Sequence, residues 1–204
     1  METRIGFGYD SHVFKPGVTL RVGGLTLDHP EGLAGHSDGD VLLHAITDAL
    51  LGAVAAGDIG SFFPPGDPRW KDADSAIFLN LALEELTNAG YQIVNIDTTL
   101  VLAAPKIGPI AGEMRARVAD LLGLDIDQVS IKAKTPEGLN LDHVAQCHAV
   151  ALVERVLEPE DLKSMSAVIE SQRQLEDVVE DLLASVHGVP KKRIAPVYDT
   201  EDIT

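Results

Sequence analysis

Residues 36–56 read HSDGDVLLHAITDALLGAVAA, and this stretch indicates the class of fold. Its apolar residues recur at the spacing of one helix face, namely at Val41, Leu42, Ala45, Ala49 and Leu50. Ser37 and Asp38 are residue types that favour N-cap positions, so we expect a helix that begins near them and continues to the end of the stretch. His44 and Asp48 lie one turn apart on this helix, which therefore carries polar groups as well as core residues.

Strand and helix patterns alternate on both sides of this helix. Composition and spacing predict strands at Arg4–Gly8, Thr19–Gly23, Ile93–Leu102 and Val129–Lys134. Further helices are predicted from Asp74 or Ser75 to Asn88 and at Ile110–Leu122, and loops at Phe62–Pro68 and Pro105–Gly108. The apolar segment Val144–Leu157 predicts a helix or a strand–helix pair. This order of elements predicts a single α/β, or layered α+β, domain over residues 1–158.

The composition changes after residue 157. Glu158–Asp161 has the composition of a linker, and Leu162–Val186 is amphipathic, with apolar residues along one side of a predicted helix. Gly188 and Pro190 would end that helix, and Lys191–Thr204 has the composition of a loose tail. Residues 159–204 are therefore expected to form a C-terminal extension.

The overall composition is typical of a globular protein with a strong negative charge. Among 204 residues, 45% are hydrophobic and 24% charged, and the formal net charge is -16. Such a charge disfavours binding to nucleic acid and to anionic membrane surfaces. The single cysteine, Cys147, cannot form an internal disulfide, and METRIGFGYD does not resemble a signal peptide. We therefore expect a cytoplasmic location.

Asp10, His12 and His44 are candidate ligands of a catalytic metal ion. Side chains two residues apart on an extended chain share one face, so Asp10 and His12 can approach one point. Two imidazoles and a carboxylate leave one position of a tetrahedral zinc site open, although manganese and iron also accept these ligands. The pattern is equally compatible with an Asp10 that caps a turn and a His44 that is merely satisfied by hydrogen bonds.

Three other segments could contact a phosphate ester. His36 and Ser37 precede the helix that carries His44, where free N–H groups favour anions, but the local pattern favours Ser37 and Asp38 as caps only. Asp58–Gly60 and Phe63–Asp67 form a loop that is long enough to cover a ligand, or could simply connect two helices. Thr135 and Glu137 follow a strand and suit a phosphate with a hard cation, although the pattern alone favours a solvated turn.

Four motifs together carry a resemblance to a known family. GFGYDSH at 6–12, GHSDGDVLLHAITDALLGA at 35–53, GDIGSFFPPGDP at 57–68 and KAKTPEG at 132–138 closely resemble the 2-C-methyl-D-erythritol 2,4-cyclodiphosphate synthase family of the non-mevalonate isoprenoid pathway. The resemblance covers about residues 3–157, and the block from His36 to Asp67 is highly specific. It implies a mixed sheet packed on helices, in a homotrimer whose active sites lie between subunits.

The resemblance also implies a reaction. The 2-phosphate of 4-diphosphocytidyl-2-C-methyl-D-erythritol 2-phosphate attacks the β-phosphorus of its cytidine diphosphate arm. The products are 2-C-methyl-D-erythritol 2,4-cyclodiphosphate and CMP. The nucleophile is already an anion, so the enzyme has to offset the repulsion between two phosphates, which metal ions and oriented N–H donors can do.

Matched positions imply the roles of individual residues. Asp10, His12 and His44 match the zinc ligands, and Glu137 matches a ligand of a magnesium or manganese ion that bridges the diphosphate. His36 and Thr135 match two residues that stabilise the transition state. Asp48 matches an aspartate that could orient His44. Substrate contacts are implied for Asp10, Ser11, His12, His36, Ser37, Asp58, Ile59, Gly60, Phe63, Pro64, Pro65, Gly66, Asp67, Ala104, Pro105, Lys106, Lys134, Thr135, Pro136 and Glu137.

The sequence departs from the family pattern at three places. Residues 138–144, GLNLDHV, lack the aromatic residue and the arginine found there in many relatives, which leaves in doubt the binding of isoprenoid diphosphates on the trimer axis. Pro65 replaces an aspartate common in the covering loop. The extension after Pro159 has no counterpart in the family. It could pack on the trimer exterior, join separate trimers, or be partly disordered. We favour the first alternative because an amphipathic stripe needs burial.

Two other functions fit part of the same pattern. A phosphoesterase would use the same metal to release CMP by hydrolysis, and would incorporate oxygen from labelled water where a cyclase would not. A non-catalytic metal-binding or scaffold protein would have lost part of the site. Every matched metal and phosphate position is filled in this sequence, which argues against that loss.

Overall fold

The computed structural model describes residues 2–156 and 159–187, and the side chains of the second range only from 167 to 183. The chain divides into two compact units, Met1–Val156 and Leu157–Thr204. The first contains a five-stranded sheet in the order β4-β1-β7-β5-β6, in which only β5 and β6 pair in parallel. The prediction of a mixed sheet packed on helices is confirmed.

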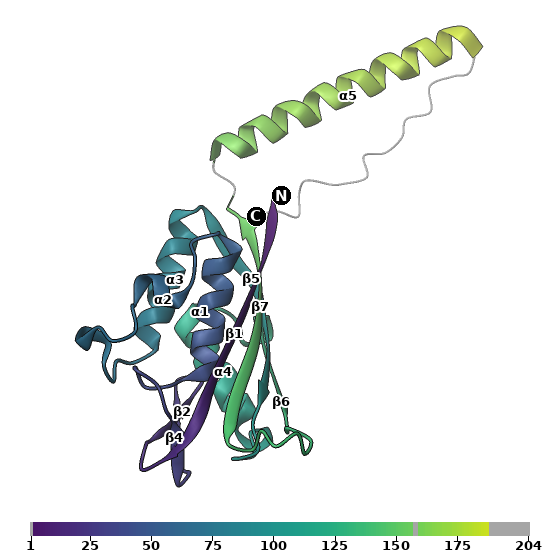
Figure 1. Ribbon diagram of the computed structural model, residues 1–204. Coiled ribbons are helices and arrows are strands. Elements are labelled where there is room, and N and C mark those ends of the chain that lie inside the picture. The colour runs from purple at the N-terminus through teal and green to yellow at the C-terminus, as the bar shows by residue number, and fades with distance from the viewer. Residues whose placement is uncertain (1, 157–158, 188–204) are drawn as a thin grey trace. The chain divides into compact units, whose positions relative to one another are not determined.

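The sheet and its helices have the following bounds. The strands are β1 (Thr3–Pro16), β4 (Glu31–Leu33), β5 (Tyr91–Val101), β6 (Val129–Lys134) and β7 (Val144–Arg155), and β2 (Leu20–Val22) with β3 (Leu25–Leu27) forms a separate hairpin. The helices are α1 (Val41–Ala53), α2 (Ile59–Phe62), α3 (Ala76–Asn88) and α4 (Ala111–Leu122), with short 3-10 turns at Pro68–Trp70, Gly108–Ile110 and Ile126–Gln128. As Figure 1 shows, α1, α3 and α4 cover one face of the sheet.

Two glycines bring α1 against β1. A Cβ atom on Gly6 would lie 1.7 Å from the carbonyl oxygen of Ala49, and one on Gly8 would lie 1.9 Å from that of Ala45. Any side chain at either position would therefore push the helix away from the strand. Asp10 and His12 continue the same face of β1 beyond these glycines, so the close packing also sets their distance from α1.

The start of α1 differs from the prediction, because Asp40 rather than Ser37 or Asp38 is the N-cap. The buried Asp40 carboxylate accepts hydrogen bonds from the backbone N–H groups of Leu42 and Leu43, and also from Gly23 and Gly24 in the β2–β3 turn. Four donors satisfy this carboxylate and tie the hairpin to the helix. Ser37 and Asp38 consequently remain outside the helix and take part in the site described below.

The segment Val144–Arg155 is a strand, so the prediction of a helix or a strand–helix pair was wrong. Its buried residues alternate and are small, namely Ala145, Cys147, Ala149, Ala151 and Val153. Alanine favours helices in isolation, but here the flanking strands β1 and β5 provide the hydrogen-bond partners. β1 is also longer than predicted, so Asp10 and His12 lie within the strand instead of after it.

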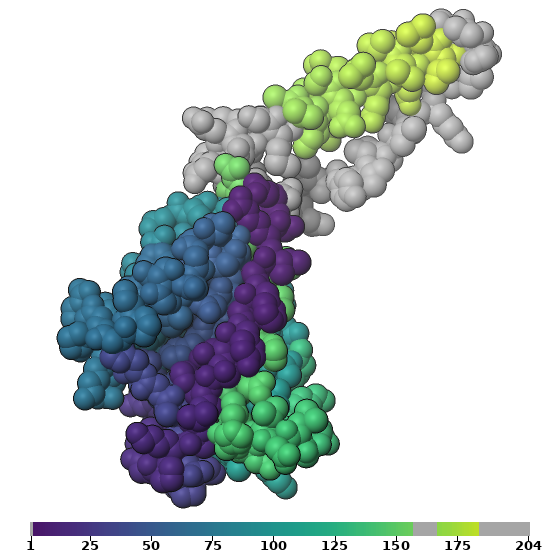
Figure 2. Space-filling view, viewed as in Figure 1, coloured from purple at the N-terminus to yellow at the C-terminus, as the bar shows by residue number. Residues whose placement is uncertain are grey.

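The other face of the sheet is not covered by helices of the first unit. Apolar side chains on this open face include Ile5, Phe7, Tyr9, Val13 and Val150, and Ile5 and Phe7 are 70% and 61% exposed. In the space-filling view, β1 forms a continuous band of surface beside the blue helices (Figure 2). Isolated apolar residues on a surface are common, whereas a contiguous row of them indicates a surface that contacts another molecule.

The second unit contains α5 (Pro159–His187). The helix begins at Pro159, so the predicted linker Glu158–Asp161 is shorter than expected; proline suits the first turn of a helix because its missing N–H has no helical partner there. Across the described residues, no helix has the length and apolarity needed to span a membrane. The predicted loose tail Lys191–Thr204 lies outside the described residues.

Candidate metal centre and substrate cavity

Asp10, His12 and His44 bring three ligand atoms to one point. Asp10 and His12 project from β1, and His44 projects from the first turn of α1. Asp10 Oδ2 lies 2.9 Å from His12 Nε2 and 2.9 Å from His44 Nδ1, and the two ring nitrogens are 3.1 Å apart. The residues predicted from their types and spacing therefore meet in space, and each offers one ligand atom.

This triangle has the dimensions of a metal site. In a tetrahedral zinc site with bonds of about 2.0 Å, neighbouring ligand atoms are about 3.3 Å apart. The observed separations fall slightly below that value, so an ion needs only a small outward adjustment of the three side chains. Three ligands on one side leave the fourth position open, which is the arrangement of a catalytic centre.

The outer ring nitrogens of both histidines have partners that orient the rings. His12 Nδ1 donates to the carbonyl oxygen of Ala34 at 2.8 Å, which leaves its Nε2 lone pair facing the centre. His44 Nε2 lies 2.8 Å from Ser75 Oγ and 3.1 Å from Ser37 Oγ, so its Nδ1 faces the centre in the same way. Such outer partners select the tautomer that can bind a metal.

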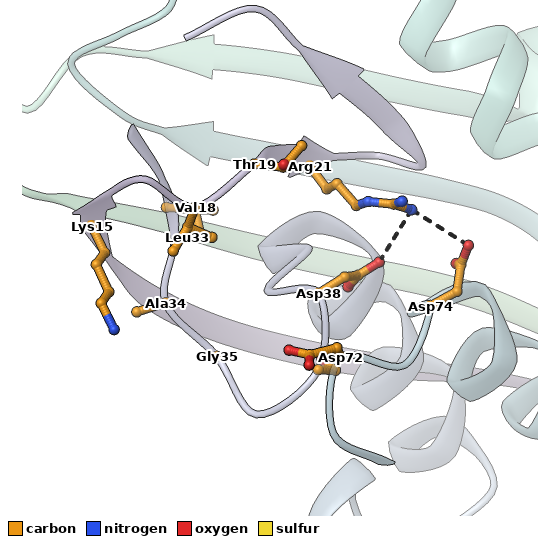
Figure 3. A pocket seen from close by; sticks show the side chains of 11 residues that line it. Lys15, Val18, Thr19, Arg21, Leu33, Ala34, Gly35, Asp38, Asp72 and Asp74 are labelled. Atoms are coloured by element: carbon orange, nitrogen blue, oxygen red, sulfur yellow. Dashed lines mark ion pairs between the residues drawn. The ribbon is translucent and has the colours of Figure 1, made fainter. Parts of the chain in front are cut away.

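Ser75 connects His44 to a carboxylate outside the metal centre. Its hydroxyl group and its backbone N–H both donate to Asp38. Arg21 lies on the far side of Asp38, with its Nη1 3.9 Å from Asp38 Oδ2 and 3.5 Å from Asp74 Oδ2 (Figure 3). A chain of polar contacts thus runs from Arg21 through Asp38 and Ser75 to the metal ligand His44.

The proximity of Asp10 and His12 changes the proton affinity of both groups. Burial raises the pKa of Asp10, but hydrogen bonds from His12 and His44 lower it more, so the pKa is well below the usual range. Burial alone would lower the pKa of His12, whereas its hydrogen bond and charge interaction with Asp10 raise it above the ordinary value. Without a metal, the carboxylate and a protonated His12 therefore stabilise each other.

A cavity of about 210 Å³ opens onto the three ligands. Most of its other lining comes from positions predicted to contact the substrate, namely His36, Ser37, Ile59, Gly60, Phe63 and Pro65. His36 Nε2 donates to the carbonyl oxygen of Asp67 at 2.8 Å and so joins the segment before α1 to the covering loop. The structure therefore brings the first three motifs to one cavity.

Two aromatic residues of this cavity and the partner of His44 were not predicted from the sequence. Trp70 and Phe78 line the cavity, and both rings pack on Phe63, with centroids 4.8 Å and 4.3 Å away. Phe78 appeared only as one apolar residue of a helix, and Ser75 only as a possible cap. Their role depends on the position of α3 beside α1, which no local pattern records.

Asp48 makes a different contact from the one expected. Its Oδ1 accepts a hydrogen bond from the backbone N–H of Ile59 at 2.8 Å, and burial raises its pKa. Ser75 and Ser37 take the position next to the His44 ring that was expected for Asp48, because the ring points toward α3. Asp48 thus anchors the start of the covering loop, and Asp58 caps the same turn through Ser61.

A second cavity of about 300 Å³ lies where β5 and β6 end. Four of the predicted substrate contacts line it, namely Pro105, Lys106, Lys134 and Thr135, together with Leu102 and Ala103; the predicted contact Ala104 does not. The Thr135 hydroxyl donates to the Glu137 carboxylate, and both side chains are exposed. Ser11, Asp58, Pro64, Gly66, Asp67, Pro136 and Glu137 line neither of the two cavities.

The two cavities are separated across the sheet within one chain. Ser11 pairs with Gln146, Gln146 with Val101, and Val101 with Lys134, so one row crosses β1, β7, β5 and β6. Three strand steps of about 4.8 Å place the Ser11 and Lys134 backbones about 14 Å apart. The metal centre and the Thr135–Glu137 segment therefore lie apart within one chain.

Comparisons with known proteins agree on one family. The YgbB family model matches residues 3–154. A 2-C-methyl-D-erythritol 2,4-cyclodiphosphate synthase from Koribacter versatilis is 60% identical over 74% of this chain and 98% of its own length. The synthase from Moorella thermoacetica is 53% identical over 67% of this chain and 83% of its own length.

Solved structures give the same result. A 2C-methyl-D-erythritol-2,4-cyclodiphosphate synthase in a CDP-bound form matches with a TM-score of 0.70 and 39% identity, over 74% of this chain and all of that one. A Plasmodium falciparum IspF–CDP complex matches with a TM-score of 0.67 and 34% identity, over 76% of this chain and 97% of that one. The chain therefore belongs to the YgbB family, that of the 2-C-methyl-D-erythritol 2,4-cyclodiphosphate synthases.

Proposed function

We propose that this chain is a lyase that cyclises 4-diphosphocytidyl-2-C-methyl-D-erythritol 2-phosphate to 2-C-methyl-D-erythritol 2,4-cyclodiphosphate and releases CMP. The observation that carries this proposal is the convergence of Asp10, His12 and His44 in one cavity with His36 and Ser37. The family and the CDP-bound relatives supply the substrate class. The reaction is a step of isoprenoid biosynthesis by the non-mevalonate route.

The protein residues would act by holding a folded substrate. An oxygen of the 2-phosphate forms a bond to the β-phosphorus, and the bond from that phosphorus to the CMP oxygen breaks. The nucleophile is already ionised, so the site needs no strong base. Positioning both ends of one molecule supplies much of the rate, because the step is intramolecular.

His36 and Ser37 are placed to hold the attacking phosphate. Both line the cavity beside the three ligand atoms, where an imidazole and a hydroxyl group can contact phosphate oxygens. His36 donates through Nε2 to Asp67, and in the protonated ring Nδ1 remains available to a phosphate oxygen. We assign His36 and Thr135 to the stabilisation of the transition state from opposite ends of the substrate.

We propose zinc at Asp10, His12 and His44. Two nitrogen ligands, one oxygen ligand and an open fourth position fit that ion, and the outer partners of both histidines favour the metal-binding tautomer. A bound ion would orient a phosphate and withdraw charge from its oxygens. Glu137, held by the Thr135 hydroxyl, would hold a magnesium or manganese ion that accompanies the diphosphate.

We further propose a homotrimer in which each active site combines half-sites from two subunits. The metal cavity and the cavity beside Thr135 share no lining residue within one chain, although the substrate joins a cytidine to a methylerythritol phosphate. The open apolar face of the sheet, with Ile5, Phe7 and Tyr9, provides a surface for assembly.

Product analysis tests the reaction. The purified chain is incubated with the cytidyl substrate and magnesium, and phosphorus NMR follows CMP and the cyclic diphosphate. The same assay in ¹⁸O-labelled water separates the cyclase from a phosphoesterase. Formation of CMP with a labelled, open-chain phosphate would overturn the cyclase assignment.

Mixing two inactive variants tests the shared site. His44→Ala removes a ligand of the metal half, and Glu137→Gln removes a ligand of the other half. If each site takes its halves from neighbouring subunits, reassembly of an equal mixture restores both wild-type halves in about a quarter of the sites. Activity that stays at the level of the separate variants, despite proven subunit exchange, would contradict the shared site.

A further inference from the structure

The α5 helix has an apolar stripe with the spacing of a helix that packs on other helices. Val168, Leu175, Val179 and Leu182, with Gln172, follow one another at alternating steps of four and three residues. This 3.5-residue average is the period that keeps one seam directed toward a partner helix. Val168 and Leu175 are 64% and 62% exposed, so most of the surface of these two side chains is available to a partner.

The stripe is wider than the seam of a two-stranded coiled coil. Ile169 and Leu183 lie on one side of the seam and Val178 on the other, and all three side chains are exposed. A strict two-stranded seam uses only two of seven positions, whereas a bundle of more helices also buries the flanking positions. The width of the stripe therefore favours a bundle of three helices over a pair.

The polar face of α5 restricts the kind of partner. Five acidic residues, Glu170, Glu176, Asp177, Glu180 and Asp181, accompany the single basic residue Arg173 over positions 167–183. Such a face is repelled by anionic lipid surfaces and by nucleic acid. Glu170, Asp177 and Glu180 lie away from the seam. Identical helices can therefore meet along the seam without bringing these charges together.

The sequence connects α5 closely to the proposed trimer. Only residues 157 and 158 separate Val156 from Pro159. Within the catalytic unit, Thr3 pairs with Glu154 and Ile5 pairs with Leu152, so the chain leaves the sheet next to the open apolar face. If that face surrounds the trimer axis, three chains leave near the axis, and the short connection keeps three copies of α5 at high effective concentration.

We infer that the α5 helices of the three subunits pack together as a parallel three-helix bundle. This inference rests on the homotrimer proposed above and gives residues 159–187 a partner, namely the same segment of the other subunits. The matched region in the family ends at residue 154, so this bundle would be an addition of this chain to a common catalytic unit. Packing on the exterior of the trimer and joining of separate trimers are the competing outcomes.

Cysteine cross-linking of the full chain tests the bundle. The native Cys147 is buried, so an introduced cysteine is the accessible thiol. A parallel bundle brings the same seam residue of each helix together, so Val179→Cys should form disulfide-linked chain pairs under mild oxidation. Asp177→Cys, on the outer face two residues earlier, is the matched control and should stay uncross-linked. Both variants should retain cyclase activity.

The two competing arrangements give other results. Absence of linked pairs for Val179→Cys, or equal linking at both positions, would overturn the bundle and support packing elsewhere. A full-length mass twice that of the trimer by light scattering would also overturn it, in favour of joined trimers. A chain truncated after residue 156 lacks α5 but keeps the part that matches the Koribacter relative over 98% of that protein's length. The mass and the cyclase activity of this truncated chain test the trimer and the reaction without α5. Linked pairs in a chain whose truncated form is monomeric would support the bundle and show that α5, and not the sheet of the catalytic unit, holds the subunits together.

Discussion

His44 Nε2 lies 2.8 Å from the Ser75 hydroxyl, although 31 residues separate these two residues in the sequence. The contact fixes the ring of a candidate metal ligand from the start of a second helix. Asp38 in turn accepts a hydrogen bond from the backbone N–H of Ser75. The geometry of the metal centre therefore depends on the packing of α3 beside α1, as well as on the three ligands themselves.

Ser75→Ala should weaken metal binding by about 10- to 100-fold while leaving all three ligands in place. The ring of His44 then loses its strongest outer partner and with it the preference for the metal-binding tautomer. Metal affinity is measured by competition with a chromogenic chelator. Ser61→Ala is a suitable control because, among the hydrogen bonds of the described residues, its hydroxyl bonds only to the exposed Asp58. Equal affinity of the Ser75 variant and the wild type would show that Ser37 alone orients the ring.

His44→Ala should abolish both stoichiometric metal binding and cyclase activity, because two ligands are too few for a stable zinc site. Metal content after dialysis and CMP release are the two measurements. His29→Ala, whose ring contacts only the Glu31 backbone and Phe14 among the described contacts, should keep both. An active His44 variant with unchanged metal content would mean that the ligand assignment is wrong.

The pH dependence of stability should have opposite signs with and without metal. In the metal-free protein the pKa of His12 is raised, so its interaction with Asp10 stabilises fully below the unfolded value of about 6.5 and is lost as pH rises through the folded value. A metal instead needs neutral imidazoles, so its contribution grows with pH over the same window.

Thermal unfolding at about pH 6 and about pH 8 measures both effects. Each form is compared with His12→Gln, which removes the titrating ring and a metal ligand together. In the metal-free protein, the difference in melting temperature between wild type and His12→Gln should be larger at the lower pH. In the metal-loaded protein, the same difference should be larger at the higher pH. The same sign in both forms would contradict the pairing of His12 with Asp10.

Gly8→Ala should destabilise the protein by about 1–3 kcal/mol or more, because its Cβ would meet the Ala45 carbonyl oxygen. The resulting shift of α1 against β1 should also lower metal affinity, since it separates His44 from Asp10 and His12. Gly112→Ala in α4, where a Cβ meets nothing within 4 Å, is the control and should stabilise by up to about 1 kcal/mol. Urea unfolding measures both.

Several features could be predicted because they are written locally in the chain. The helical period over residues 41–53 predicts α1, and the alternation and β-branched residues at residues 93–101 predict β5. Asp10 and His12 could be placed on one face because strand geometry has a period of two. The resemblance to a family added the roles of these residues, which spacing by itself left open.

Other features depend on contacts between distant segments. β7 is an alanine-rich strand only because β1 and β5 flank it, and no pattern within Val144–Arg155 records those neighbours. The N-cap of α1 is Asp40 because that carboxylate also binds the β2–β3 turn. Local propensity contributes less free energy than the hydrogen bonds and burial that tertiary packing provides. It therefore could not predict the β7 strand or the N-cap of α1.

The sequence by itself thus determined which residues could hold a metal and which elements would carry them. Only the tertiary structure decided that His44 reaches Asp10 across a pair of glycines and that Ser75 rather than Asp48 holds its ring. It also decided that the cavity at Asp10, His12 and His44 and the cavity beside Thr135 lie on separate parts of one chain. The physical reason is that ligand distances and ring orientations are set by the packing of helices on the sheet, which involves residues far apart in sequence.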